Sequence, residues 1–295
     1  RSFILMIKVL ITGGSGLVGA SLLEKLSQHY TLFTVGLSKP ALVNVHHINL
    51  DLATDWDTSA LPDEMDIVIH LAQSRHYKDF PESCENVFSV NTASTLKLLN
   101  YARSANVRKF IYASSGGVYG TGEKAFTEDS PLMMDEALGF YLGTKLCSEL
   151  IVRNYSDFFD IDILRFFFVY GERQPQSMLI PRLINSVRNG IPITLQGESG
   201  ISINPIHVDD VAELVSKLLL LDGSHTLNIA GGQELSLRRI SEIIGTALNC
   251  EPVFGTADGA PKNLIGDISQ MIDLLGKPSL TFEQGVTKLI TAASN

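Results

Sequence analysis

Near-continuous apolar runs alternate with helix-like segments along the first 170 residues of the chain. The apolar runs lie at 7–12, 32–36, 66–71, 109–114 and 161–169. The segments with helical periodicity lie near 16–28, 84–104 and 137–156. Strands that are apolar on both faces are typical of a parallel sheet covered by helices on each side. The alternation therefore predicts an α/β fold with a Rossmann-type doubly wound parallel sheet.

Near residue 170 this pattern changes. Gly and Pro become frequent, and the helical segments are short, at 177–189, 209–221 and 236–248. We expect residues 6–170 and 203–223 to form the main domain. Residues 171–202 and 224–295 are expected to form a smaller C-terminal region at the carboxyl edge of the sheet, where ligands of such folds bind. Residues 1–5 precede Met6, and we expect them to be a vector remnant.

Charge and composition exclude several classes of function. The chain of 295 residues carries 23 basic and 32 acidic residues, a net charge of −9, whereas nucleic-acid binding needs clustered Lys and Arg. No apolar stretch reaches the roughly 18 residues of a membrane span. Cys84, Cys147 and Cys250 lie far apart without the spacing of zinc ligands, as in a reducing compartment. We expect a cytoplasmic protein that binds no nucleic acid, no membrane and no metal.

A glycine-rich turn joins the first strand to the first helix. Residues 11–20 read ITGGSGLVGA and match the G-x-G-x-x-G fingerprint of dinucleotide binding in its strand–turn–helix context. The glycines allow a tight turn, the approach of a pyrophosphate and close helix packing, and the pyrophosphate lies on free N–H groups of the helix. A plain glycine turn is the alternative. The predicted cofactor contacts are Gly13, Ser15, Gly16, Leu17, Val18 and Gly19.

The end of the second strand bears on the choice of cofactor. An acidic residue there would bind the ribose 2′-hydroxyl of NAD, yet no Asp or Glu occurs from residue 25 to residue 50. Ser38 and Lys39 follow the strand instead, and a small residue beside a cation suits a 2′-phosphate. The sequence therefore predicts NAD(P) and slightly favours NADP over NAD. Lys39 as an ordinary solvated lysine is the alternative.

Tyr141 and Lys145 lie four residues apart in a helical segment and therefore share one face of the helix. A tyrosine with its ordinary pKa is a poor base at pH 7, and lowering that pKa by about 3 units takes about 4 kcal/mol. An ammonium about 4 Å away supplies on the order of 4 kcal/mol. The pair predicts a general base, Tyr141, whose pKa Lys145 lowers. Upstream, Ser115 ends a strand and can hydrogen-bond a substrate oxygen, although serines also occur in plain turns.

With these motifs the chain resembles the extended short-chain dehydrogenase/reductase family, in its nucleotide-sugar epimerase/dehydratase branch. The motifs occur in family order between residue 7 and about residue 245. They are the TGGSGLVG turn, Asp51-Leu52, His70-Leu71-Ala72, Val90-Asn91, the segment 114–120, Tyr141 with Lys145, and the segments 164–171 and 207–210.

The resemblance implies roles for individual residues. Tyr141 would be the general base and acid, Lys145 would hold the nicotinamide ribose, and Ser115 matches the catalytic Ser/Thr position. The main domain would then bind the dinucleotide, the smaller region would bind the substrate, and a homodimer would form through segments 84–104 and 137–156. Asn91 is alternatively structural, and Phe167 would lie near the nicotinamide. The further cofactor contacts implied are Asp51, Leu52, Leu71, Ala72, Gln73, Asn91, Ser114 and Phe167.

Two positions depart from the family pattern, both in the predicted substrate region. Phe168 and Ile203 stand where the family often has an Asn and an Arg that hold nucleotide-sugar phosphates. Either the substrate is bound without the usual contacts to a diphosphate, or another cation provides these contacts. The candidates are Arg75, Arg173 and Arg182, each of which is alternatively a surface arginine.

These features lead to one main hypothesis and two alternatives. The main hypothesis is an NAD(P)-dependent nucleotide-sugar epimerase of the 4-epimerase type, in which Tyr141 takes a hydroxyl proton while hydride passes transiently to the nicotinamide. Gly116-Gly117 stand where dehydratases of the family place Asp-Glu, which favours epimerisation over dehydration. The alternatives are an NADPH-dependent reductase of a keto-sugar or other carbonyl compound, and a non-catalytic protein that senses NADP(H).

Four polar residues near strand ends are predicted to be structural. Asp209 and Asp210 are expected to cap the start of a helix with their carboxylates. His70 and His207 end strand-like runs and are expected to be packed in the interior.

Overall fold

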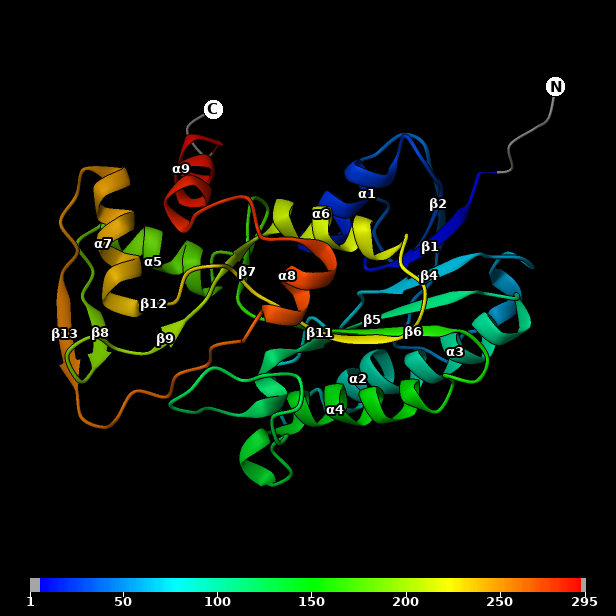
Figure 1. Ribbon diagram of the computed structural model, residues 1–295, viewed down its shortest axis with the longest axis horizontal. Helices are drawn as coiled ribbons and strands as arrows, with labels where there is room; N and C mark the ends of the chain where they lie inside the picture. The colour runs from blue at the N-terminus through cyan, green and yellow to red at the C-terminus, as the bar shows by residue number, and fades with distance from the viewer. Residues whose placement is uncertain (1–5, 293–295) are drawn as a thin grey trace. The chain divides into compact units, whose positions relative to one another are not determined.

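The computed structural model describes residues 6–292, so the predicted vector remnant lies outside the described residues. A seven-stranded sheet has the order β11-β6-β5-β4-β1-β2-β3 (Figure 1). Its inner strands pair in parallel, with Leu10 opposite both Phe33 and Val68. The predicted doubly wound parallel sheet is confirmed. The strands are β1 (Lys8–Thr12), β2 (Thr31–Gly36), β3 (Val45–Asn49), β4 (Ile67–His70), β5 (Lys109–Ser115), β6 (Asp160–Phe166) and β11 (His225–Ile229).

Helices cover both faces of this sheet (Figure 1). One face carries α1 (Leu17–Leu26), and the other carries α2 (Cys84–Phe88), α3 (Ser94–Ser104) and α4 (Phe140–Arg153). A π-helical turn, Ser89–Ala93, joins α2 to α3, so that the predicted helix at 84–104 is one continuous helical segment with a widened turn. Between the sheet and the helices lies an apolar core in which Leu10, Val68 and Phe110 are fully buried, as the near-continuous hydrophobic runs require.

The described chain divides into two compact units. The first comprises residues up to 118 together with 133–165 and 215–227, and the second comprises 119–132, 166–214 and residues from 228 onward. The chain passes between the units inside α6 (Val208–Leu218) and inside β11. Residues 119–132 and 203–214, which the sequence analysis assigned to the main domain, make their contacts within the second unit. The domain boundaries drawn by function stay a prediction.

The second unit is built from short strands and amphipathic helices. Three strand pairs are present: β7 (Val169–Tyr170) with β10 (Ile206–His207), β8 (Ile193–Gln196) with β13 (Phe254–Ala257), and β9 (Ser202–Ile203) with β12 (Leu235–Ser236). Apolar faces of the helices close a second core, in which Ile203, Ile240 and Ile244 are fully buried. The helices that contribute to this core are α5 (Leu179–Arg188), α7 (Leu237–Leu248) and α9 (Phe282–Ala292), and the unit also contains α8 (Ser269–Leu275).

Short 3₁₀ turns complete the described chain at Thr58–Ala60, Gly116–Tyr119 and Glu136–Leu138. Within residues 6–292, every helix is too short or too polar to cross a membrane.

Candidate active site and cofactor-binding turn

The glycine turn holds the end of β1 close to the start of α1. Gly13 has a φ of +73°, and a Cβ there would lie 2.9 Å from the backbone N of Ala72. A Cβ at Gly19 would lie 2.2 Å from the carbonyl oxygen of Gly13. Gly16 is the N-cap of α1, and no side chain in the described part of the chain caps this helix. The N–H groups of the first turn are therefore available to an anion, as a dinucleotide pyrophosphate requires.

A chain of hydrogen bonds links this turn to the helical segment on the other side of β4. The N–H of Ala72 donates to Thr12 Oγ1 (3.1 Å), and Thr12 Oγ1 lies 2.7 Å from His70 Nδ1. His70 Nε2 lies 2.9 Å from Thr95 Oγ1, which donates its own proton to the carbonyl of Asn91 (2.7 Å). Nε2 is therefore the donor of a neutral imidazole. Burial lowers the pKa of His70 to about 3, and the predicted interior position is confirmed.

Tyr141 and Lys145 occupy one face of α4 at the ends of β4 and β5. The phenol of Tyr141 donates to Gln73 Oε1 at 2.8 Å, and Lys145 Nζ donates to the carbonyl of Ala113 at 2.8 Å. Ser115 is the last residue of β5, and its hydroxyl accepts the N–H of Gly117 at 3.1 Å. The structure therefore gathers these three predicted catalytic residues in the first unit, the unit that also holds the glycine turn.

Gly117 explains how α4 approaches the end of β5. A Cβ at this glycine would lie 2.8 Å from Leu142 Cδ2 and 3.3 Å from Ser115 Oγ. The missing side chain therefore lets the first turn of α4 pack beside Ser115.

The electrostatics of the pair differ from the expectation. Burial raises the pKa of Tyr141, and the nearby Tyr77 adds to this rise. Burial also lowers the pKa of Lys145 to about 8, against the opposing influence of Glu149. In this arrangement the ammonium is turned to Ala113 and the phenol is desolvated, so the lowering of the pKa of Tyr141 by Lys145 stays a prediction.

Asn91 has a structural position. It is 1% exposed, its Oδ1 accepts the N–H of Ser74 (2.9 Å), and its Nδ2 donates to Thr144 Oγ1 (3.0 Å). Asn91 thus ties the loop after β4 to α4 at Thr144, the residue before Lys145. Of the two predicted roles, these contacts favour the structural one.

Three other predicted cofactor residues have their side chains engaged by the protein. The hydroxyl of Ser114 donates to Glu149 Oε1 at 2.5 Å, and Leu52 is 6% exposed within the core. Asp51 Oδ1 accepts the N–H of Ala53 at 2.9 Å. These side chains already have protein partners, and their predicted cofactor contacts stay predictions.

The residues after β2 are open to solvent. Ser38 and Lys39 are exposed, and Lys39 is close enough to His47 on the neighbouring strand to lower the pKa of that imidazole. Burial is the larger cause of the lowered pKa. A cation therefore stands at the position where the sequence predicts a 2′-phosphate.

The predicted substrate residues fall in both units. Phe167 is 1% exposed and stacks on Tyr119 within the second unit, so that its predicted contact with a nicotinamide stays a prediction. Phe168 is half-buried with a φ of +45°, a conformation that bulky residues rarely adopt. The candidate phosphate ligands are exposed, Arg75 in the first unit and Arg173 and Arg182 in the second.

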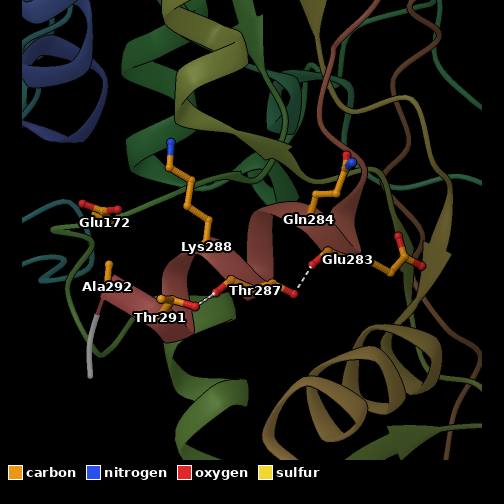
Figure 2. Close-up of a pocket in the computed structure, with 7 residues that line it drawn as sticks. All are labelled: Glu172, Glu283, Gln284, Thr287, Lys288, Thr291 and Ala292. Atoms are coloured by element: carbon orange, nitrogen blue, oxygen red, sulfur yellow. Dashed lines mark hydrogen bonds between the residues drawn. The ribbon is translucent and has the colours of Figure 1, made fainter. Parts of the chain in front are cut away.

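A cavity of about 650 Å³ lies along α9 in the second unit (Figure 2). Hydroxyls of Thr287 and Thr291 are bonded to backbone carbonyls one turn earlier (2.8 and 2.9 Å), and Lys288 pairs with Asp209. The predicted site residues do not line it. Its lining consists of Glu172, Glu283, Gln284, Thr287, Lys288, Thr291 and Ala292.

The acidic pair at the start of α6 has partners outside its own helix. Asp209 and Asp210 lie in the first turn, as expected. Asp210, however, accepts the N–H and the hydroxyl of Ser279 (2.8 and 2.6 Å) and the N–H of Leu280 (3.0 Å). The predicted capping role is corrected, because this carboxylate anchors the segment before α9. The predicted interior position of His207, which is 3% exposed, is confirmed.

Comparison with known proteins identifies the class. Residues 9–230 match the family model of the NAD dependent epimerase/dehydratase family, and the chain belongs to this family. It is an NAD(P)-dependent enzyme of the extended short-chain dehydrogenase/reductase type, which confirms the resemblance.

Relatives and a solved structure are similar over most of the chain. UDP-glucuronate 4-epimerase of Thermodesulfobacterium geofontis is 30% identical over 232 residues, 76% of this chain and 71% of that protein. The uncharacterized UDP-glucose epimerase YtcB of Bacillus subtilis is 27% identical over 315 residues, 98% of each chain. The crystal structure of UDP-glucuronic acid 4-epimerase from Bacillus cereus, in complex with UDP-glucuronic acid and NAD, has a TM-score of 0.86 at 25% identity and covers 98% of this chain and 99% of its own.

Two residues beside the predicted catalytic pair were not predicted from the sequence. Tyr77 lies with its ring 5.0 Å from that of Tyr141, and Glu149 influences Lys145. Glu149 follows Lys145 by four residues, the same step that separates Lys145 from Tyr141, so this spacing was a usable signal. Nothing in the sequence pointed to Tyr77.

Proposed function

We propose that the protein is an NAD(P)-dependent nucleotide-sugar epimerase of the 4-epimerase type. The observation that carries the proposal is the position of Tyr141 and Lys145 on one helix face at the ends of β4 and β5, in the unit that holds the glycine turn. Relatives named as 4-epimerases of UDP sugars, and a structure with UDP-glucuronic acid and NAD, support a sugar nucleotide as substrate.

The residues of this chain then divide the proton chemistry among them. When bound, the dinucleotide takes up and gives back a hydride, so the reaction needs no net oxidant. Tyr141 accepts the proton of the reacting hydroxyl and later returns it, and Ser115 hydrogen-bonds the same oxygen. Desolvation raises the pKa of Tyr141, so the phenol needs a cation nearby to ionise at neutral pH, and Lys145 is the cation on its helix face.

A panel of sugar nucleotides tests this function. Purified protein is incubated with each compound, with NAD and with NADP, and the products are separated by chromatography. We expect interconversion of one pair of C4 epimers without net change in cofactor absorbance. Tyr141→Phe should lower kcat by about 10²- to 10⁴-fold, the usual contribution of a general base, with an unchanged melting temperature. Net consumption of NADPH with a keto-sugar would instead establish the reductase.

A different result distinguishes the third possibility. If NADP(H) binds tightly to both the wild type and Tyr141→Phe, and no compound is turned over by either, the protein is a sensor without chemistry.

We also propose that NADP is preferred over NAD. The support is the exposed pair Ser38 and Lys39 after β2, without an acidic residue from 25 to 50. His47 lies within the electrostatic reach of Lys39, and its Nε2 is buried with no partner in the described chain. We expect Lys39→Ala to weaken NADPH binding about tenfold, the loss of one ion pair with a phosphate, and to leave NADH binding unchanged. Equal weakening of both cofactors in fluorescence titrations would contradict this preference.

A further inference from the structure

Three charged side chains lie buried together behind Tyr141. Lys145, Glu149 and Arg165 are 2%, 1% and 2% exposed. Arg165, from β6, donates through Nε to Glu149 Oε1 (3.0 Å) and through Nη2 to Oε2 (2.8 Å). Ser114, from β5, donates to Oε1 at 2.5 Å. Both oxygens of Glu149 are therefore held by donors, as a buried carboxylate requires.

The spacing along α4 places this carboxylate beneath Lys145. Tyr141, Lys145 and Glu149 follow one another at steps of four residues, so they form one stripe on the helix. Lys145 Nζ lies 5.4 Å from the ring centroid of Tyr112 from β5. Lys145 is also close enough to the neutral His70 from β4 to contribute to the lowered pKa of that imidazole. Within residues 6–292, Glu149 is the anion that acts on Lys145 and opposes its desolvation.

We propose that Glu149, held in place by Arg165 and Ser114, is a positioning residue that keeps Lys145 protonated and directed at the end of β5. The role of Lys145 itself rests on the proposed function. The ion pair with Arg165 partly neutralises Glu149 and so determines how strongly Glu149 stabilises the ammonium of Lys145. Removal of Glu149 leaves two buried cations, which disfavours the ammonium. Removal of Arg165 leaves a Lys145–Glu149 pair, which favours it.

These opposite effects can be measured without substrate or cofactor. The side-chain amine of Lys145 is followed by NMR in protein labelled with ¹³C-lysine, with its signal assigned by its loss in Lys145→Arg. We expect Glu149→Gln to lower the pKa of Lys145 by about one unit and Arg165→Met to raise it by a similar amount, the usual effect of one nearby charge. Arg153→Met is the matched control, because Arg153 lies 3.7 Å from Glu149 with a side chain 46% exposed, and should leave the pKa unchanged.

The signs of the shifts decide the outcome. Shifts of opposite sign in folded Glu149→Gln and Arg165→Met support the proposal, whereas shifts of the same sign, or none, overturn it. If Glu149→Gln does not fold, the double variant Glu149→Gln/Arg165→Met takes its place, and its pKa must lie below that of Arg165→Met. The result is independent of turnover, so a failure here leaves the Tyr141→Phe experiment as the test of the function.

Discussion

Replacement of Gly19 by Ala tests how closely α1 approaches the glycine turn. The new Cβ would lie 2.2 Å from the carbonyl oxygen of Gly13 and 2.7 Å from the Cα of Gly14. Both are backbone atoms, so neither can rotate away, and the helix must move. Gly143, in α4, is the matched control, because a Cβ there meets no atom within 4 Å.

The expected magnitudes have opposite signs. Overpacking costs about 1–3 kcal/mol, and more where backbone must move, while Ala in place of Gly inside a helix contributes about 1 kcal/mol of stability. Gly143→Ala should therefore raise the free energy of unfolding by about 1 kcal/mol. Gly19→Ala should lower it by about 1–2 kcal/mol net. At roughly 2–4 °C per kcal/mol, the melting temperatures of the two variants should differ by about 5–10 °C.

Differential scanning calorimetry of both variants, with and without dinucleotide, measures this difference. Calorimetry is suited to a protein with two compact units, because transitions that are not two-state are visible in it. Gly19→Ala should also bind the dinucleotide more weakly, since the first-turn N–H groups move with the helix. Equal melting temperatures for the two variants would refute the close approach of α1 to β1.

Two further predictions concern buried charges. Folding lowers the pKa of Lys145 from 10.5 to about 8. Between these pH values the unfolded chain therefore binds more protons than the folded protein, and stability rises with pH. Relative to Lys145→Met, the free energy of unfolding of the wild type should rise by about 3 kcal/mol from pH 8 to pH 10.5. Urea denaturation across this range checks the slope, and a constant difference contradicts it. Asp210→Ala should lower the free energy of unfolding by about 2–3 kcal/mol, because its hydrogen bonds to Ser279 and Leu280 are lost. Asp209→Ala is the control: its carboxylate is 41% exposed, and the variant should lose less than about 1 kcal/mol of stability. Similar urea midpoints for the two variants would contradict the anchoring role of Asp210.

The fold was predictable where burial imposes a simple pattern. β1, β4 and β5 are covered on both faces, and their continuous apolar runs marked them within one or two residues. β3 is an edge strand with the sequence VHHIN, in which His46 and Asn49 are exposed. It contains no apolar run from which the strand could have been predicted. The two-residue strands of the second unit are too short to show any period.

The candidate site was predictable as a spacing but not as an arrangement. The step of four positions from Tyr141 to Lys145 predicts that they share one helix face, which the structure has. The partner of each side chain is set by tertiary packing, so the sequence could not show that Lys145 is turned to Ala113. The partner of Asp210 is likewise 69 residues away in sequence, beyond the reach of any local rule.

The neutral imidazole of His70 makes this half of the molecule vulnerable to acid. In the folded protein it resists protonation down to a pH of about 3, whereas in the unfolded chain it takes up a proton near pH 6.5. Mild acidification therefore draws the equilibrium toward the unfolded chain. When the imidazole is released, the bridge from Thr12 to Thr95 opens, and the turn after β1 and the segment that supports α4 lose their common anchor.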